Sequence, residues 1–280
     1  MDTLGDRMKG YETSSEVKLI KRLPVIIRVD GRSFSRLCRK LHKPYDPLFL
    51  EAMAETMHYV VSEMAGACFA YQQSDEITFI LKNDQTNETE PWYGNRVQKI
   101  SSIAAGLATL GLQKSLVGLN LDLVGDAIFD ARVWVVPNLS EALNALIWRQ
   151  NDCVKNAVAG TSLALLGKKY GRKTAMKLVH GKSAKERLMI LQDECNIDFH
   201  QEYPASFRLG VACYKAPFVY TGLDKSTSTR KRWILDWEFP LITEKKDFVS
   251  NILMTGHDVF RAENFEVIET EKENVKEKGN

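Results

Sequence analysis

Apolar positions along the first 170 residues follow two different periods. Four short apolar runs bounded by polar residues or glycine predict strands, at residues 23–29, 68–72, 77–81 and 127–136. Three longer segments with apolar residues every three or four positions predict helices, at residues 47–65, 95–110 and 140–170. Pro47 suits the first turn of one helix, and Ser140 suits the N-cap of another.

The predicted elements follow the order β-α-β-β-α-β, which is the ferredoxin-like order. We therefore expect an α+β fold with an antiparallel sheet and helices on one face. Residues 206–216 and 233–243 predict a C-terminal strand pair, and the polar segment 217–232 between them predicts a linker. The charged residues 266–280 predict a disordered tail.

This order divides the chain into a catalytic core and an extension. Residues 1–137 would form the core, and residues 138–265 would add extra helices and the strand pair to complete one catalytic domain. The polar loop 83–91 would join the third strand to the second helix.

Composition narrows the class of protein. A hydrophobic content of 44% in 280 residues is ample for a core, and the net charge of +2 means that any basic surface must be local. The five cysteines show no zinc-site spacing, which favours free thiols in a reducing compartment. Neither a signal peptide nor a membrane span is recognised, so we expect a cytoplasmic protein without a membrane partner.

Candidate chemistry begins at two acidic turns. Asp30 ends the apolar run of VIIRVDGRSF, and Asp75 and Glu76 follow a predicted strand in QQSDEITF. In a β-α-β-β sheet these turns can be neighbours, and two close carboxylates repel unless cations lie between them. Two Mg²⁺ ions would suit oxygen ligands of this kind, and Gly31 would allow close approach of a phosphate. The alternatives are that these acids merely cap helices or form turns, or that Arg28 or Arg32 pairs with Asp30.

Seven segments together resemble one family. They are, in chain order, VIIRVDGRSFSRL, HKPYD, QQSDEITF, NRVQKISS, FDARV, WRQNDCVKN and HGKS. They run from about residue 24 to residue 183 and resemble the tRNA(His) guanylyltransferase family, which includes guanylyltransferase-like members that polymerise RNA in the 3′-to-5′ direction.

The resemblance implies a fold like the palm of ordinary polymerases. It implies that Asp30, the Gly31 carbonyl and Asp75 hold two Mg²⁺ ions, with Glu76 beside them as a third catalytic residue. Family members look like enzymes that activate a tRNA 5′-monophosphate with ATP, after which the 3′-hydroxyl of an incoming nucleotide such as GTP attacks the activated end. Both steps depend mostly on positioning and charge neutralisation.

The same resemblance implies further binding residues. The nucleotide would be bound by Arg32, Ser33, Phe34, Lys43, Asp46, Ser74 and Asp75. The tRNA 5′ end or a triphosphate would meet Arg96, Lys99, Lys155, Asn156 and Lys182. Arg149 and Gln150 would pack their helix against the sheet. For the lysines and arginines, the alternative is an ordinary solvated surface.

One segment departs from the family pattern. Members that add a single guanosine to tRNA(His) carry HINNLYNT where residues 154–161 here read VKNAVAGT. This difference favours the guanylyltransferase-like branch, whose members repair 5′-truncated tRNA.

Two local basic clusters are candidates for RNA binding, because phosphate contacts supply affinity that does not depend on sequence. They comprise Lys168, Lys169, Arg172, Lys173, Arg230, Lys231 and Arg232. Family members look like homotetramers, so a neighbouring subunit could complete the RNA-binding surface. Two other functions are kept open: a palm-type nucleotide cyclase, and a non-catalytic RNA-binding protein.

Overall fold

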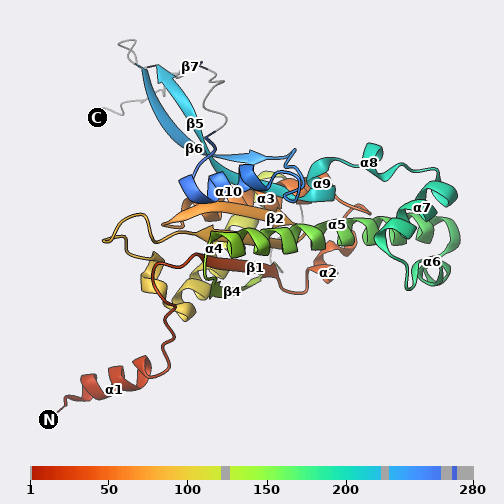
Figure 1. The fold of residues 1–280 in the computed structure, drawn as a ribbon. Helices are drawn as coiled ribbons and strands as arrows, with labels where there is room; N and C mark the ends of the chain where they lie inside the picture. The colour runs from red at the N-terminus through yellow and green to blue at the C-terminus, as the bar shows by residue number, and fades with distance from the viewer. Residues whose placement is uncertain (1, 121–126, 222–226, 260–266, 270–280) are drawn as a thin grey trace, which may run out of the picture.

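The computed structural model describes residues 2–120, 127–221, 227–259 and 267–269. A single sheet with the strand order β4-β1-β3-β2-β5-β6 runs through the centre of the molecule (Figure 1). Every pair along this path is antiparallel. The predicted α+β class is confirmed.

The first four strands and two of the helices form the ferredoxin-like unit. Its elements are, in chain order, β1 (Val25–Gly31), α3 (Pro47–Ser62), β2 (Ala67–Gln73), β3 (Glu76–Leu81), α4 (Val97–Gly118) and β4 (Phe129–Val135). β1 lies between β3 and β4. The predicted β-α-β-β-α-β order is therefore confirmed, and Pro47 is the first residue of its helix, as expected.

Helices α3 and α4 cover one face of the sheet. Odd-numbered residues of β1, such as Val25, Ile27 and Val29, are buried there with Met53 and Leu112 from the two helices. By length and apolar content α4 could cross a membrane, which is weak evidence because core helices of soluble proteins have the same character. One side of α4 contributes to this core, which accounts for its apolar sequence.

The opposite face of the sheet is covered by α5 (Leu139–Tyr170) and α10 (Lys246–Thr255). Ile26 and Ile80 pack there with Leu146 of α5 and Ile252 of α10. Helices thus cover both faces of the sheet, whereas the sequence predicted helices on one face. Because both faces are covered, every residue of β2 and β3 is buried.

The C-terminal strand pair differs from the prediction. β5 (Val211–Thr221) and β6 (Thr227–Asp236) extend into the segment predicted to be a linker and project beyond the sheet as a ribbon (Figure 1). Residues 205–209 form the helix α9, and β6 ends before residue 237. Within the predicted tail, Val267–Glu269 form β7, which pairs with β5; the rest of that tail lies outside the described residues.

The remaining elements are short. They are α1 (Leu4–Thr13), α2 (Phe34–Leu37), the 3₁₀ helices η1 (Cys38–Lys40) and η2 (Trp92–Asn95), α6 (Arg172–Val179), α7 (Ala184–Cys195), α8 (Phe199–Glu202) and α9 (Ala205–Leu209). Helices α6 and α7 pack on the distal half of α5, while α1 stands away from the body (Figure 1). The N-cap of α5 is Asn138, whose side chain accepts a hydrogen bond from Glu141; the prediction of Ser140 was wrong by two residues.

Candidate active site

The two predicted acidic turns meet at one end of the sheet. Asp30 is the sixth residue of β1, and Asp75 lies in the two-residue turn that joins β2 to β3. The backbone amide of Gly31 donates a hydrogen bond to the carbonyl oxygen of Asp75 over 3.0 Å. This bond confirms that the two turns are neighbours, although Asp30 and Asp75 are 45 residues apart in the sequence.

Burial and proximity change the electrostatics of the turn. Burial raises the pKa of Asp75 above its ordinary value, and the neighbouring carboxylate of Asp30 raises it further. A cation between the two groups would relieve this repulsion. The carboxylates of Asp30 and Asp75 are ligands of the kind that suits Mg²⁺, which usually takes one or two carboxylates and leaves room for water and substrate phosphates.

No larger metal cluster surrounds them: residues 2–120, 127–221, 227–259 and 267–269 contain no group of three or more histidine, cysteine or acidic side chains placed to hold an ion. Gly31 also has a local steric role. A Cβ at this position would lie 2.5 Å from the Phe34 ring, so the close approach of that ring requires glycine.

Glu76 is engaged by arginine. Glu76 on β3 lies directly opposite Asp30 on β1. Its Oε2 accepts a hydrogen bond from Arg149 over 2.8 Å and lies 3.6 Å from the Nε of Arg28. Burial raises the pKa of Glu76, and the two guanidinium groups oppose that shift. The prediction that Arg149 packs α5 against the sheet is confirmed, and Glu76 is the sheet residue that receives it.

The contacts of Arg149 continue along α5. Its second guanidinium nitrogen lies 3.5 Å from Asp152, which accepts a hydrogen bond from Asn156 over 3.3 Å. Gln150 bonds the backbone of Leu209 and Pro240 and accepts a bond from the amide of Ile242. Gln150 is therefore structural, as predicted, but it bonds the segments that flank β5 and β6 and not a strand of the sheet.

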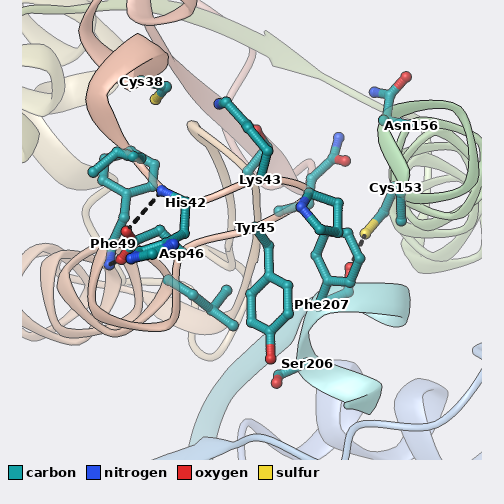
Figure 2. A pocket seen from close by; sticks show the side chains of 17 residues that line it. Cys38, His42, Lys43, Tyr45, Asp46, Phe49, Cys153, Asn156, Ser206 and Phe207 are labelled. Carbon is teal, nitrogen blue, oxygen red and sulfur yellow. Dashed lines mark hydrogen bonds between the residues drawn. The ribbon is translucent and has the colours of Figure 1, made fainter. Parts of the chain in front are cut away.

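A cavity of about 260 Å³ opens beside the Ser74–Asp75 turn (Figure 2). Four predicted binding residues line it: Lys43, Asp46, Ser74 and Asn156. They come from the loop before α3, the β2–β3 turn and α5, so the fold brings together residues separated by more than 100 positions. A cavity with a lysine at one wall and the acidic turn at another is suited to a nucleotide and its phosphates.

Asp46 shapes the cavity through its backbone contacts. Its Oδ1 caps α3 by accepting hydrogen bonds from the amides of Leu48 and Phe49, and its Oδ2 accepts one from the amide of His42. These three bonds fix the loop that carries Lys43, whose side chain is exposed.

An aromatic contact joins this loop to the extension. The ring of Tyr45 stacks on Phe207 of α9 with centroids 4.6 Å apart (Figure 2). It also makes a T-shaped contact with Tyr203, with centroids 6.0 Å apart. Sequence reasoning missed both Tyr45 and Phe207 as cavity residues. It also missed Cys38 and Cys153, which line the cavity as protonated thiols because burial raises their pKa to about 11 and about 12.

Residues 32–34 turn away from β1 into α2. The amide of Arg32 donates to the carbonyl of Ile128, Ser33 has a positive φ of 59°, and the Phe34 ring is buried against Phe129. Phe34 can therefore contact a nucleotide through its backbone, since its side chain belongs to the core.

The predicted RNA-end residues are scattered. Arg96 lies 3.5 Å from Glu16 in the segment before β1 and bonds the carbonyl of Tyr93. Lys99 lies over the ring of Tyr93, which belongs to η2 before α4. Lys155 is exposed on α5, close to the cavity residue Asn156. Lys182 pairs with Glu186 where α7 begins, on the α6–α7 arm.

The two basic clusters lie on different parts of the molecule. Lys168, Lys169, Arg172 and Lys173 are exposed where α5 meets α6, and Lys169 is paired with Glu194. The second cluster, Arg230, Lys231 and Arg232, is exposed on the projecting β6.

By fold and site the chain is a polymerase-palm protein, with converging carboxylates at the end of a ferredoxin-like sheet. A family model described as "Thg1: tRNAHis guanylyltransferase" matches residues 5–137. A bacterial tRNA(His) guanylyltransferase-like protein, solved in complex with ATP, is 30% identical, with a TM-score of 0.76 over 90% of this chain and 99% of that one. The chain belongs to the tRNA(His) guanylyltransferase family.

The matches to two curated relatives cover only part of each protein. An uncharacterized mimivirus protein, R259, is 34% identical over 56% of this chain, and a human probable tRNA(His) guanylyltransferase is 31% identical over 64% of it. Each match spans 61% of the relative's length. The yeast tRNA(His) guanylyltransferase structure, 23% identical with a TM-score of 0.64 over 72% of this chain and 90% of that one, shares the fold.

Proposed function

We propose that this protein adds nucleotides to the 5′ end of tRNA in the 3′-to-5′ direction, through an activated 5′ end. The observation that carries the proposal is the hydrogen bond between Gly31 and Asp75, because it holds two carboxylates together beside a cavity. Relatives named tRNA(His) guanylyltransferase, and similar proteins solved with ATP and with GTP, support nucleotide transfer to tRNA as the reaction.

Asp30, Asp75 and the Gly31 carbonyl would hold two Mg²⁺ ions. The ions, when bound, supply positive charge to the phosphate oxygens that react. Lys43 would contact the triphosphate of ATP or GTP as a point charge, and Ser74 and Asn156 would donate to the same ligand from opposite walls of the cavity. Asp46 and Tyr45 hold the loop that presents Lys43.

The substrate proposed here is 5′-truncated tRNA. Lys155 and Asn156 occupy the α5 segment in which VKNAVAGT replaces the pattern typical of single-guanosine addition. The basic cluster at the α5–α6 junction would bind the tRNA backbone, with Lys182 on the same arm.

Assembly and location complete the proposal. We infer a homotetramer in the cytoplasm. The exposed apolar side chains of Leu4, Met8 and Tyr11 on α1 support contact between subunits. The five free cysteine thiols support a reducing compartment. Analytical ultracentrifugation of the full chain tests the assembly: a monomer at micromolar concentration contradicts it.

A single assay tests the activity. The protein is incubated with ATP, GTP, Mg²⁺ and a tRNA transcript that lacks its first nucleotide and carries a 5′-monophosphate. We expect growth at the 5′ end, and loss of that growth by several orders of magnitude in Asp30→Ala. A cyclic nucleotide formed without RNA would identify a cyclase instead, and binding without turnover would identify a non-catalytic RNA-binding protein.

A further inference from the structure

Trp148 is exposed in the first third of α5, the helix that covers the candidate active site. Its side chain is 52% exposed, although the next two residues of α5, Arg149 and Gln150, are buried. All five tryptophans lie within the described residues, and the other four are buried or half-buried. Exposing this ring costs free energy, and the hydrophobic clusters formed by the described residues do not include it.

Two guanidinium groups hold the ring in place. The Cζ of Arg149 lies 3.7 Å from the centroid of the Trp148 ring, and the Cζ of Arg28 lies 5.6 Å from it. Both arginines are themselves fixed by Glu76. The ring is therefore a preorganised aromatic surface, held by two guanidinium groups and with about half of its area open to solvent.

The ring also lies close to the acids. One guanidinium separates it from Glu76, which pairs with Asp30 across the sheet. Gln150, on another side of α5, turns toward the backbone of Leu209 and Pro240, while Trp148 lies toward Arg28 of β1. β4 is the edge strand beyond β1, and its Arg132 lies directly opposite Arg28 in the strand register.

We propose that Trp148 is a stacking platform for the 5′-terminal nucleobase of the RNA substrate; this inference rests on the proposed function. An RNA whose 5′-phosphate reaches Asp30 and Asp75 would bring its first base within reach of the ring. The Lys43 cavity uses other residues of α5, Cys153 and Asn156, so the base of the bound triphosphate has a separate site. Stacking accepts every base because each has a π face, which suits repair of different tRNAs.

The test compares two RNAs and three proteins. One RNA is a tRNA transcript with a 5′-monophosphate and without its first nucleotide; the other is identical but abasic at its 5′-terminal residue. Affinity is measured by fluorescence anisotropy at fixed salt. We expect Trp148→Ala to bind the intact RNA about 10-fold more weakly and the abasic RNA as well as the unaltered protein does, while Trp148→Phe retains most of the affinity. Met254→Ala, which removes a similarly exposed apolar side chain from α10, is the control.

Three results would overturn the inference. Equal losses with both RNAs would mean that Trp148 acts through Arg149 or contacts the RNA backbone. A raised KM for the triphosphate with unchanged RNA affinity would assign the ring to the other base. A change in oligomeric state would assign it to a subunit contact. If the protein never extends RNA but the base-dependent loss is observed, the stacking site stands and the proposed reaction fails.

Discussion

Gly31 and Asp75 are joined by a backbone hydrogen bond of 3.0 Å between the end of β1 and the β2–β3 turn. The bond uses main-chain atoms, so it fixes the spacing of the two acidic turns without occupying either carboxylate. Neither carboxylate is used by this bond, and the pKa of Asp75 is raised mainly by burial and further by the carboxylate of Asp30.

Asp75→Asn should separate stability from activity. Asp75 has a raised folded-state pKa, so its contribution to stability is greatest below the ordinary aspartate pKa of 3.8 and is lost as the pH rises through the folded-state value. Without Mg²⁺, the variant should therefore melt about 1–3 °C higher than the unaltered protein at pH 7 but not at pH 3.5, while losing 5′-extension activity. Equal melting temperatures at pH 7 would contradict an unfavourable charge on buried Asp75.

Gly31→Ala should damage both the fold and the site. The added Cβ meets the Phe34 ring at 2.5 Å, and overpacking of this kind costs about 1–3 kcal/mol. Urea denaturation measures the loss. Gly106→Ala, in α4 with open space around its Cβ, is the comparison and should gain about 0.5–1 kcal/mol; a similar loss in both variants would rule out the Phe34 contact as the cause.

Arg149→Met should leave the carboxylate of Glu76 short of a partner. Breaking a buried ion pair from one side costs about 3 kcal/mol, because the remaining charge stays desolvated. Adding Glu76→Gln to the same chain should restore most of the lost stability. If the double variant is as unstable as the sum of the two single variants, the two residues are not coupled.

Phe207→Ala should loosen the loop that presents Lys43. The stacked pair with Tyr45 contributes about 0.5–1.5 kcal/mol beyond its buried area. We expect a several-fold higher KM for ATP with a smaller change in kcat, measured by steady-state 5′ extension. Tyr203→Phe keeps its ring contacts and should behave as the unaltered protein does. An unchanged KM in Phe207→Ala would show that the hydrogen bonds of Asp46 alone fix the loop.

Neutralising Lys168, Arg172 and Lys173 with glutamine should reduce the salt dependence of tRNA binding. Each phosphate contact removed lowers the slope of log affinity against log salt by about 1. Lys169→Gln removes a lysine already paired with Glu194 and should change the slope less. A slope unaffected by the triple substitution would place the RNA on another surface.

The sequence predicted the ferredoxin-like unit and the meeting of Asp30 with Asp75 because both depend on local periodicity and on element order. It missed the Tyr45–Phe207 contact because that contact depends on how a short helix of the extension packs. Residues 206–209 were predicted as strand because four residues are too few to distinguish the two periods, although Gly210, with a φ of 85°, marks the break.

The projecting ribbon of β5 and β6 was read as a linker for a related reason. Its first six β6 residues are exposed, so apolar alternation is absent there. Pro217 argues against a central strand. At that position β5 has already passed the end of its pairing with β2, where proline is better tolerated.

β2 pairs with β5 along one edge and is buried along its whole length, and the cavity takes Lys43 from one half of the chain and Phe207 from the other. A protein truncated near residue 137 would thus expose β2 as an unpaired edge strand and would lack the cavity residues that α5 and α9 supply. Such a fragment would tend to aggregate through that edge strand. The two halves can be inherited or engineered only as a pair.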